Sequence, residues 1–184
     1  MAQGLWMDGA TGGDQGADTI NASAIYDDGD QITPVIVGTE VASTSGTSID
    51  FTGIPSSANI IWVQFEQTST NGTDDYLVQI GDSGGIETAS YQGTGNTNGS
   101  VATSTAGYLL KNAGAASFHT GIITLVRMNG SNKWIASGSG NIGGTGYWTT
   151  GGHKSLSGTL DRVRITTTSG TDTFDSGNVN IVYQ

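Results

Sequence analysis

Apolar and polar residues alternate with a period of two through the middle of the chain. Between positions 59 and 70, one set of alternate residues is Ile61, Val63 and Phe65. A second alternating run covers positions 76–81, and this period is typical of β-strands. Asn71-Gly72 lies between the runs, and Asn-Gly favours a hairpin because both residues tolerate positive φ. The pattern therefore predicts a hairpin at the centre of a β-sandwich.

Further alternating runs follow along the chain. They predict strands within 47–53, 86–91, 108–111, 119–128, 133–137, 155–168 and 178–183. Asn129-Gly130 predicts a second hairpin. The Gly-rich segments 92–105 and 138–152 lack a clear period and are expected to be loops. Eight or nine strands from Val41 onward indicate an all-β sandwich of jelly-roll type.

Residues 1–41 differ from the remainder, because they contain too few apolar residues to form a core alone. We expect an extended N-terminal anchoring arm over residues 1–41 and a β-sandwich domain over residues 42–184. The residues expected to anchor the arm on a particle are Leu5, Trp6, Met7, Ile20 and Tyr26. A frayed terminus is the alternative. The alternation before the acidic turn at residues 27–30 also favours a small hairpin, and that turn is expected to be solvated rather than to bind calcium.

Composition and charge narrow the classes of function. The 184 residues include 30 Gly and 2 Pro, and 12% are charged, which suits short strands and turns better than long helices. The formal net charge of −10 with six Lys and Arg makes nucleic acid an improbable partner, because phosphates require basic groups. An anionic membrane surface is equally unfavourable. We see no signal peptide and no apolar run of membrane-spanning length.

One short motif resembles a catalytic segment. Gly81-Asp-Ser-Gly-Gly85 matches the surroundings of the nucleophile in trypsin-like proteases. In that family the His and Asp of the triad precede the serine, whereas His119 and His153 both follow Ser83. We therefore expect a Gly-rich turn, in which Asp82 and Ser83 bond their own backbone, and no catalytic residues. No metal site or cofactor is expected, although a site of paired histidines across a trimer axis is the alternative.

Aromatic residues in the expected loops are candidates for sugar binding. They are Tyr91, Tyr147 and Trp148. Exposed rings beside Asn, Thr and Asp stack on sugars, but large aromatic residues are more often buried or interfacial. The alternative is that each ring caps the sandwich or packs at a subunit contact. Trp62 and Trp134 lie in expected strands, and Trp62 indicates that the second face of its strand is covered by another sheet or subunit.

Four segments of the chain, 16–29, 47–55, 71–88 and 160–183, carry a resemblance to known proteins. Through them the chain resembles a family of short bacteriophage structural proteins and tail-fibre C-terminal domains, including those from phages of cyanobacteria and marine bacteria. The resemblance implies a trimeric β-sandwich knob attached to the particle by its N-terminal part. It implies no catalytic residues.

From this resemblance we expect a virion protein that is assembled in the host cytoplasm. The first hypothesis is a capsid decoration or cement protein, whose partners are copies of itself and the major capsid protein or a tail protein of the same phage. Because the first shared segment begins at Gly16, we expect direct attachment to the particle and no long fibre shaft. The second hypothesis is a tail-associated adhesin that binds a host surface glycan. An enzyme is the third, and no constellation of residues supports it.

Overall fold

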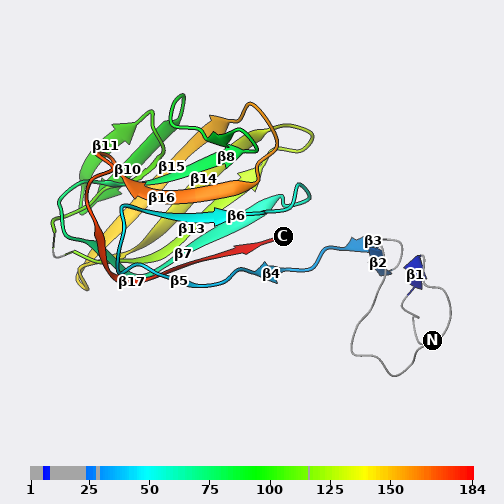
Figure 1. The fold of residues 1–184 in the computed structure, drawn as a ribbon, viewed down its shortest axis with the longest axis horizontal. Helices are drawn as coiled ribbons and strands as arrows, with labels where there is room; N and C mark the ends of the chain where they lie inside the picture. Colours follow the sequence, from blue (N-terminus) through cyan, green and yellow to red (C-terminus); the bar gives the residue numbers. More distant parts are fainter. Residues whose placement is uncertain (1–5, 9–23, 28–29, 116) are drawn as a thin grey trace, which may run out of the picture. The chain divides into compact units, whose positions relative to one another are not determined.

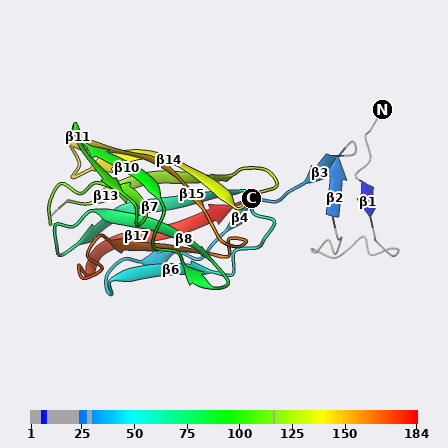
Figure 2. The same ribbon diagram turned by 90° about the horizontal axis from the view of Figure 1, so that it is seen from above.

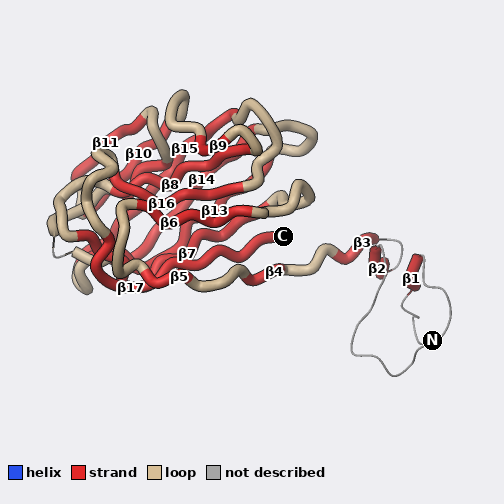
Figure 3. Tube along the Cα trace, in the orientation of Figure 1, coloured by secondary structure: helices blue, strands red, loops and turns tan. Residues whose placement is uncertain are grey.

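The computed structural model describes the backbone of residues 6–8, 24–27 and 30–32, and all of residues 33–115 and 117–184. The chain divides into two compact units, Met1–Val35 and Ile36–Gln184. All regular elements of the described residues are β-strands (Figure 3), which confirms the predicted all-β class. No helix in the described part of the chain is long and apolar enough to cross a membrane.

The first unit contains a three-stranded antiparallel sheet. Its strands are β1 (Trp6–Asp8), β2 (Ala24–Asp27) and β3 (Asp30–Ile32), in the order β1-β2-β3. Asp27 opposes Asp30, so the small hairpin predicted across the acidic turn is confirmed. Two of the expected anchoring residues, Trp6 and Tyr26, are opposite each other in β1 and β2. Leu5 and Ile20 lie outside the described residues.

The second unit, called the body below, begins earlier than the sequence indicated. β4 (Ile36–Val37) and β5 (Val41–Ala42) both pair with β17 (Phe174–Tyr183). Between them, the Gly38 amide donates to the carbonyl of Ile181 at 2.8 Å. The expected boundary after residue 41 is therefore corrected to one after Val35, because residues 36–41 pair with the C-terminal strand.

Two antiparallel sheets pack face to face in the body (Figures 1 and 2). The nine-stranded sheet has the order β11-β10-β15-β14-β13-β7-β17-β4, with β5 also on β17. The five-stranded sheet has the order β12-β8-β16-β6, with β9 on β8. The remaining strands of the larger sheet are β7 (Ile60–Thr70), β10 (Gln92–Thr97), β11 (Ser100–Ser104), β13 (His119–Arg127), β14 (Lys133–Ile142) and β15 (Gly146–Ser155). Those of the smaller sheet are β6 (Ser48–Thr52), β8 (Tyr76–Asp82), β9 (Gly85–Ile86), β12 (Tyr108–Leu110) and β16 (Arg162–Thr167).

The core lies between the sheets and follows the predicted alternation. The residues predicted from the period of two are buried in β7, β6 and β16: Ile61, Val63, Phe65, Ile49, Phe51, Val163 and Ile165. Trp134 is also a core residue, at 1% exposure. Arg162 and Arg164 alternate with buried residues of β16 and face outward as predicted, and Arg164 Nε pairs with Asp50 Oδ1 at 2.6 Å. The predicted β-sandwich is thus confirmed.

The predicted central hairpin is wrong. β7 and β8 belong to different sheets, so the segment around Asn71-Gly72 crosses from one sheet to the other. Asn71 exchanges hydrogen bonds with the β16–β17 connection instead: its amide donates to the Thr173 carbonyl and its side-chain oxygen accepts from the Thr173 amide, each at 2.9 Å. The second predicted hairpin is confirmed, because β13 and β14 pair along their length.

The expected loops at 92–105 and 138–152 are also corrected, because they form β10, β11, the second half of β14 and most of β15. The inward positions of β10 hold Gly93 and Gly95 rather than large apolar residues. A β-carbon at Gly93 would lie 2.3 Å from the Gly107 carbonyl oxygen, and one at Gly95 would lie 2.5 Å from that of Leu109. The backbones of the two sheets approach closely here, so β10 carries no hydrophobic period.

Candidate functional site on the outer face of the nine-stranded sheet

The three candidate sugar-binding aromatics have different environments. Tyr91 and Trp148 are 1% and 0% exposed, whereas Tyr147 is 51% exposed. The Tyr91 hydroxyl donates to the Ile80 carbonyl at 3.1 Å and accepts from the Ile80 amide at 2.7 Å. Tyr91 and Trp148 are therefore core residues, and the prediction that they contact a glycan is corrected. Tyr147 remains a candidate.

Tyr147 faces away from the core because it alternates with Trp148 along β15. Its amide donates to the side-chain oxygen of Asn98 at 3.0 Å, which ties β15 to the turn between β10 and β11. On β14 its register partner is Asn141. The phenol ring thus lies on the outer face of the nine-stranded sheet.

This outer face carries two rows of uncharged residues. Residues that are direct register partners project to the same side of a sheet, so each row can be followed from β7 through β13, β14 and β15 to β10. The first row consists of Trp62, Thr124, Ser137, Gly151 and Thr94. The second consists of Gln64, Ile122, Ser139, Thr149 and Asn96. We call these ten residues the neutral rows.

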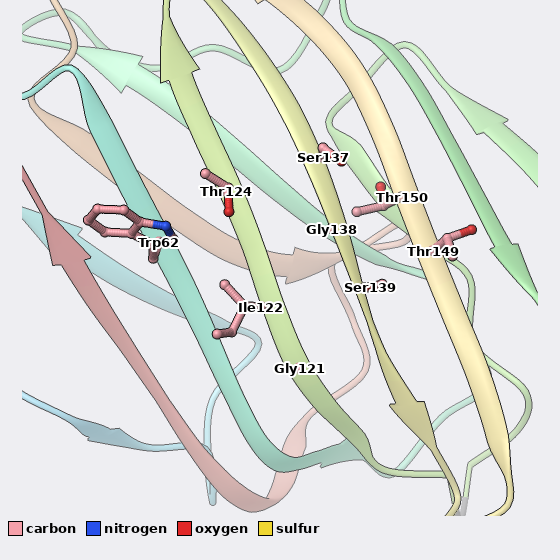
Figure 4. Close-up of a pocket in the computed structure, with 9 residues that line it drawn as sticks. All are labelled: Trp62, Gly121, Ile122, Thr124, Ser137, Gly138, Ser139, Thr149 and Thr150. Carbon is pink, nitrogen blue, oxygen red and sulfur yellow. The ribbon is translucent and has the colours of Figure 1, made fainter.

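A groove of about 790 Å³ follows the neutral rows (Figure 4). Its lining includes Trp62 and Ile122 at one side and Ser137, Ser139 and Thr149 beyond them. Small outward residues on β14 make the surface lower there than beside the indole of Trp62, which is half-buried. Trp62 therefore lines a groove on this face.

A second depression of about 470 Å³ continues the groove toward β10. It shares Thr149 and Thr150 with the first, and its lining extends to Gln92, Asn96 and His153. Neither lining contains Asp, Glu, Lys or Arg, although the chain has a formal net charge of −10. The surface offers hydroxyl and amide groups beside one indole, which suits an uncharged ligand rich in hydroxyls.

The protease-like segment forms a turn, as predicted. Asp82 opposes Gly85 across β8 and β9, and the Gly84 amide donates to Asp82 Oδ1 at 2.8 Å. His119 is 0% exposed, and its ring centroid lies 4.6 Å from that of Tyr76. Burial lowers the pKa of His119 to about 4, so this imidazole is a neutral core side chain at pH 7. His153 is exposed on the outer face.

A polar network joins the protease-like turn to the end of β15. Lys154 is 3% exposed, and its ammonium nitrogen lies 2.5 Å from Glu87 Oε2 and 5.3 Å from the centre of the Tyr91 ring. The Ser157 hydroxyl lies 2.8 Å from both Asp82 Oδ2 and Glu87 Oε1. Every named carboxylate oxygen accepts a bond from a neighbouring segment, so the network fastens loops together.

The carboxyl groups of this network have lowered pKa values. For Asp82 the main causes are hydrogen bonds from the Ser157 hydroxyl and the Gly84 amide. For Glu87, burial acts to raise the pKa, but hydrogen bonds from Lys154 and Ser157 outweigh it, and the net shift is downward. Both groups are thus stabilised as carboxylates, the form that a structural ion pair requires.

Among the described residues, no group of three or more His, Cys, Asp or Glu side chains is arranged to hold a metal ion. The neutral rows escaped the sequence analysis because half of their strands were expected to be loops. The signal was present in β10, where Gly93, Gly95 and Thr97 alternate with Thr94 and Asn96. Comparisons with family models, curated proteins and solved structures give no match.

Proposed function

We propose that this chain is a non-enzymatic structural protein of a bacteriophage virion, a capsid decoration or cement protein. It attaches to the particle through residues 1–35 and displays the body, residues 36–184. The observation that carries the proposal is the division of the chain after Val35 into a small sheet unit and a body with its own core. A display protein requires such a division, because attachment must leave the displayed domain intact.

The partners in this proposal are copies of the same chain, as a homotrimer, and the major capsid protein. Trp6 and Tyr26 oppose each other in the first unit, and large aromatic residues provide much of the binding energy in protein interfaces. The sequence resemblance to small phage virion proteins supports the same assignment. Attachment through residues 1–35 leaves the sheets of the body available for other contacts.

A tail-associated adhesin that binds a host surface glycan is the second candidate function. The groove along the neutral rows favours it, because hydroxyl and amide groups beside the half-buried ring of Trp62 match the chemistry of sugars. This candidate differs from the first in the place of attachment and not in the fold.

Removal of residues 1–35 tests the proposal. We expect the shortened chain to keep the circular dichroism and cooperative unfolding of the body, and to lose co-sedimentation with particles that lack the protein. The double variant Trp6→Ala/Tyr26→Ala in the full chain is expected to weaken co-sedimentation in the same direction. Val101→Ala is the control, because Val101 is 61% exposed on β11, the edge strand at the end of the nine-stranded sheet opposite β4. Undiminished co-sedimentation of the shortened chain would refute attachment through this unit.

A further inference from the structure

We infer that the outer face of the nine-stranded sheet is a binding site for a neutral, extended oligosaccharide, held along the neutral rows with Trp62 as its aromatic platform. The inference deepens the second candidate function and rests on the display of the body, since a displayed sheet face meets external ligands.

The exclusion of charge argues for a neutral ligand. Neither depression is lined by Asp, Glu, Lys or Arg, and a charged ligand would therefore lack a carboxylate, ammonium or guanidinium partner in the groove. A net charge of −10 for the whole chain also disfavours anionic polysaccharides through long-range repulsion. A hydroxyl-rich, uncharged ligand requires no counter-charge and is not repelled by the net charge.

The chemistry of the rows matches such a ligand. Thr124, Ser137 and Thr149 each offer a hydroxyl that both donates and accepts, and Gln64 and Asn96 offer amides. The half-buried indole of Trp62 lines the same groove. An aromatic ring binds the apolar face of a sugar, while neighbouring hydroxyls and amides bind its edge.

The extent of the face argues for several linked sugar units. The groove and its continuation cross β7, β13, β14, β15 and β10. Tyr147 is on the same face, on β15, three strands from Trp62. It lies four residues before Gly151, the β15 member of the row that contains Trp62. The usual strand and residue spacings place the two rings roughly 20 Å apart. An oligosaccharide that spans this diagonal contacts both rings, whereas a monosaccharide contacts one.

Affinity electrophoresis of the full-length chain tests the inference with a panel of neutral polysaccharides, namely dextran, laminarin, mannan and galactan, and with alginate as the anionic probe. We expect at least one neutral polysaccharide to retard the protein and alginate to have no effect. Trp62→Ala is expected to weaken binding about tenfold, as loss of one aromatic contact does. Ser137→Glu is expected to abolish binding, since it places a carboxylate within the groove.

Ser48→Glu is the matched control, because it adds the same charge at an exposed position of β6 in the other sheet. Binding of alginate alone, binding of no member of the panel, or unchanged binding by both Trp62→Ala and Ser137→Glu would overturn the inference. Sedimentation velocity of the same variants tests whether a second copy of the chain, rather than an oligosaccharide, binds this face. If Ser137→Glu converts an oligomer to a monomer and Ser48→Glu does not, the face is a subunit contact and the inference is refuted.

These measurements use the isolated protein and need no particle. Loss of sugar binding therefore leaves the attachment of residues 1–35 to a virion unaffected, and failure of that attachment leaves the groove untouched. Each proposal thus has its own test.

Discussion

The indole of Trp148 on β15 packs directly over Gly140, its register partner on β14. A β-carbon at Gly140 would lie 2.7 Å from both Cε2 and Nε1 of the indole, and 2.0 Å from the Thr120 carbonyl oxygen. Gly121 borders the same ring, since a β-carbon there would lie 2.7 Å from Cζ2. Two glycines on adjacent strands thus make the space that buries the largest side chain of this segment.

Replacement of Gly140 by Ala is therefore expected to destabilise the body by about 1–3 kcal/mol, the usual cost of overpacking a core. Urea unfolding measures the change. Gly151→Ala on β15 is the control, because its β-carbon would meet the Ala136 carbonyl oxygen at an ordinary 3.6 Å. An equal effect of the two substitutions would contradict the packing of Trp148 on Gly140.

The buried His119 makes stability dependent on pH. Its pKa is lowered from 6.5 to about 4 by burial, so between these values the unfolded chain binds a proton that the folded chain does not. Burial of the neutral His119 therefore leaves the free energy of unfolding undiminished above pH 6.5. As the pH falls from 6.5 toward 4, the free energy of unfolding decreases by a total of about 3 kcal/mol. Urea unfolding at a series of pH values measures it.

His119→Phe is expected to reduce the loss of stability between pH 6.5 and pH 4, whatever its effect at pH 7. His153→Gln is the control, because His153 is the exposed histidine of the pair, and this variant is expected to keep the parent's pH dependence. A pH profile that His153→Gln flattens and His119→Phe leaves unchanged would reverse the assignment.

The Lys154–Glu87 pair predicts an asymmetric response to neutralisation. Glu87→Gln leaves the Lys154 ammonium, which is 4% exposed at the side chain, without its carboxylate. We expect a loss of about 2–3 kcal/mol, somewhat below the 3–5 kcal/mol of a fully buried pair because Glu87 keeps contact with solvent. Lys154→Met leaves a carboxylate that is 22% exposed and still accepts from Ser157, so its loss is expected to be smaller. Thermal unfolding measures the stability of both variants. A larger loss of stability for Lys154→Met than for Glu87→Gln would contradict this account.

The protease-like turn predicts the outcome of Ser83→Ala. Ser83 is exposed in the two-residue connection between β8 and β9, and a surface substitution of this kind changes stability by less than about 0.5 kcal/mol. We expect casein hydrolysis by the variant and the parent to be equal to the buffer blank. Hydrolysis by the parent that Ser83→Ala abolishes would show that the turn is catalytic.

The strands with large alternating residues could be predicted from hydrophobicity, and those with alternating glycines could not. β7, β6 and β16 bury Val63, Phe51 and Ile165 at a period of two, so hydrophobicity alone reveals them. In β10 the inward positions are Gly93 and Gly95, because a carbonyl of the opposite sheet occupies the place of the side chain. A strand in which every second residue is glycine has the amino-acid composition that is typical of a loop.

The partner of each strand was harder to predict than the strand itself. Asn71-Gly72 has the residues of a tight hairpin, but Asn71 bonds to Thr173, 102 residues away. Local turn chemistry cannot detect such a partner. The candidate site was missed for another reason, since β10 and β15 were expected to be loops and the groove exists only where they lie beside β14, β13 and β7.

Immunogold labelling of purified virions with an antibody against residues 36–184 tests the proposed virion function most directly. The account predicts regular gold over the head of the particle, in agreement with a decoration or cement protein. Gold confined to the tail tip would support the adhesin instead. Virions that carry no gold, from a lysate in which the same antibody detects the protein, would contradict the proposal that the chain is part of the particle.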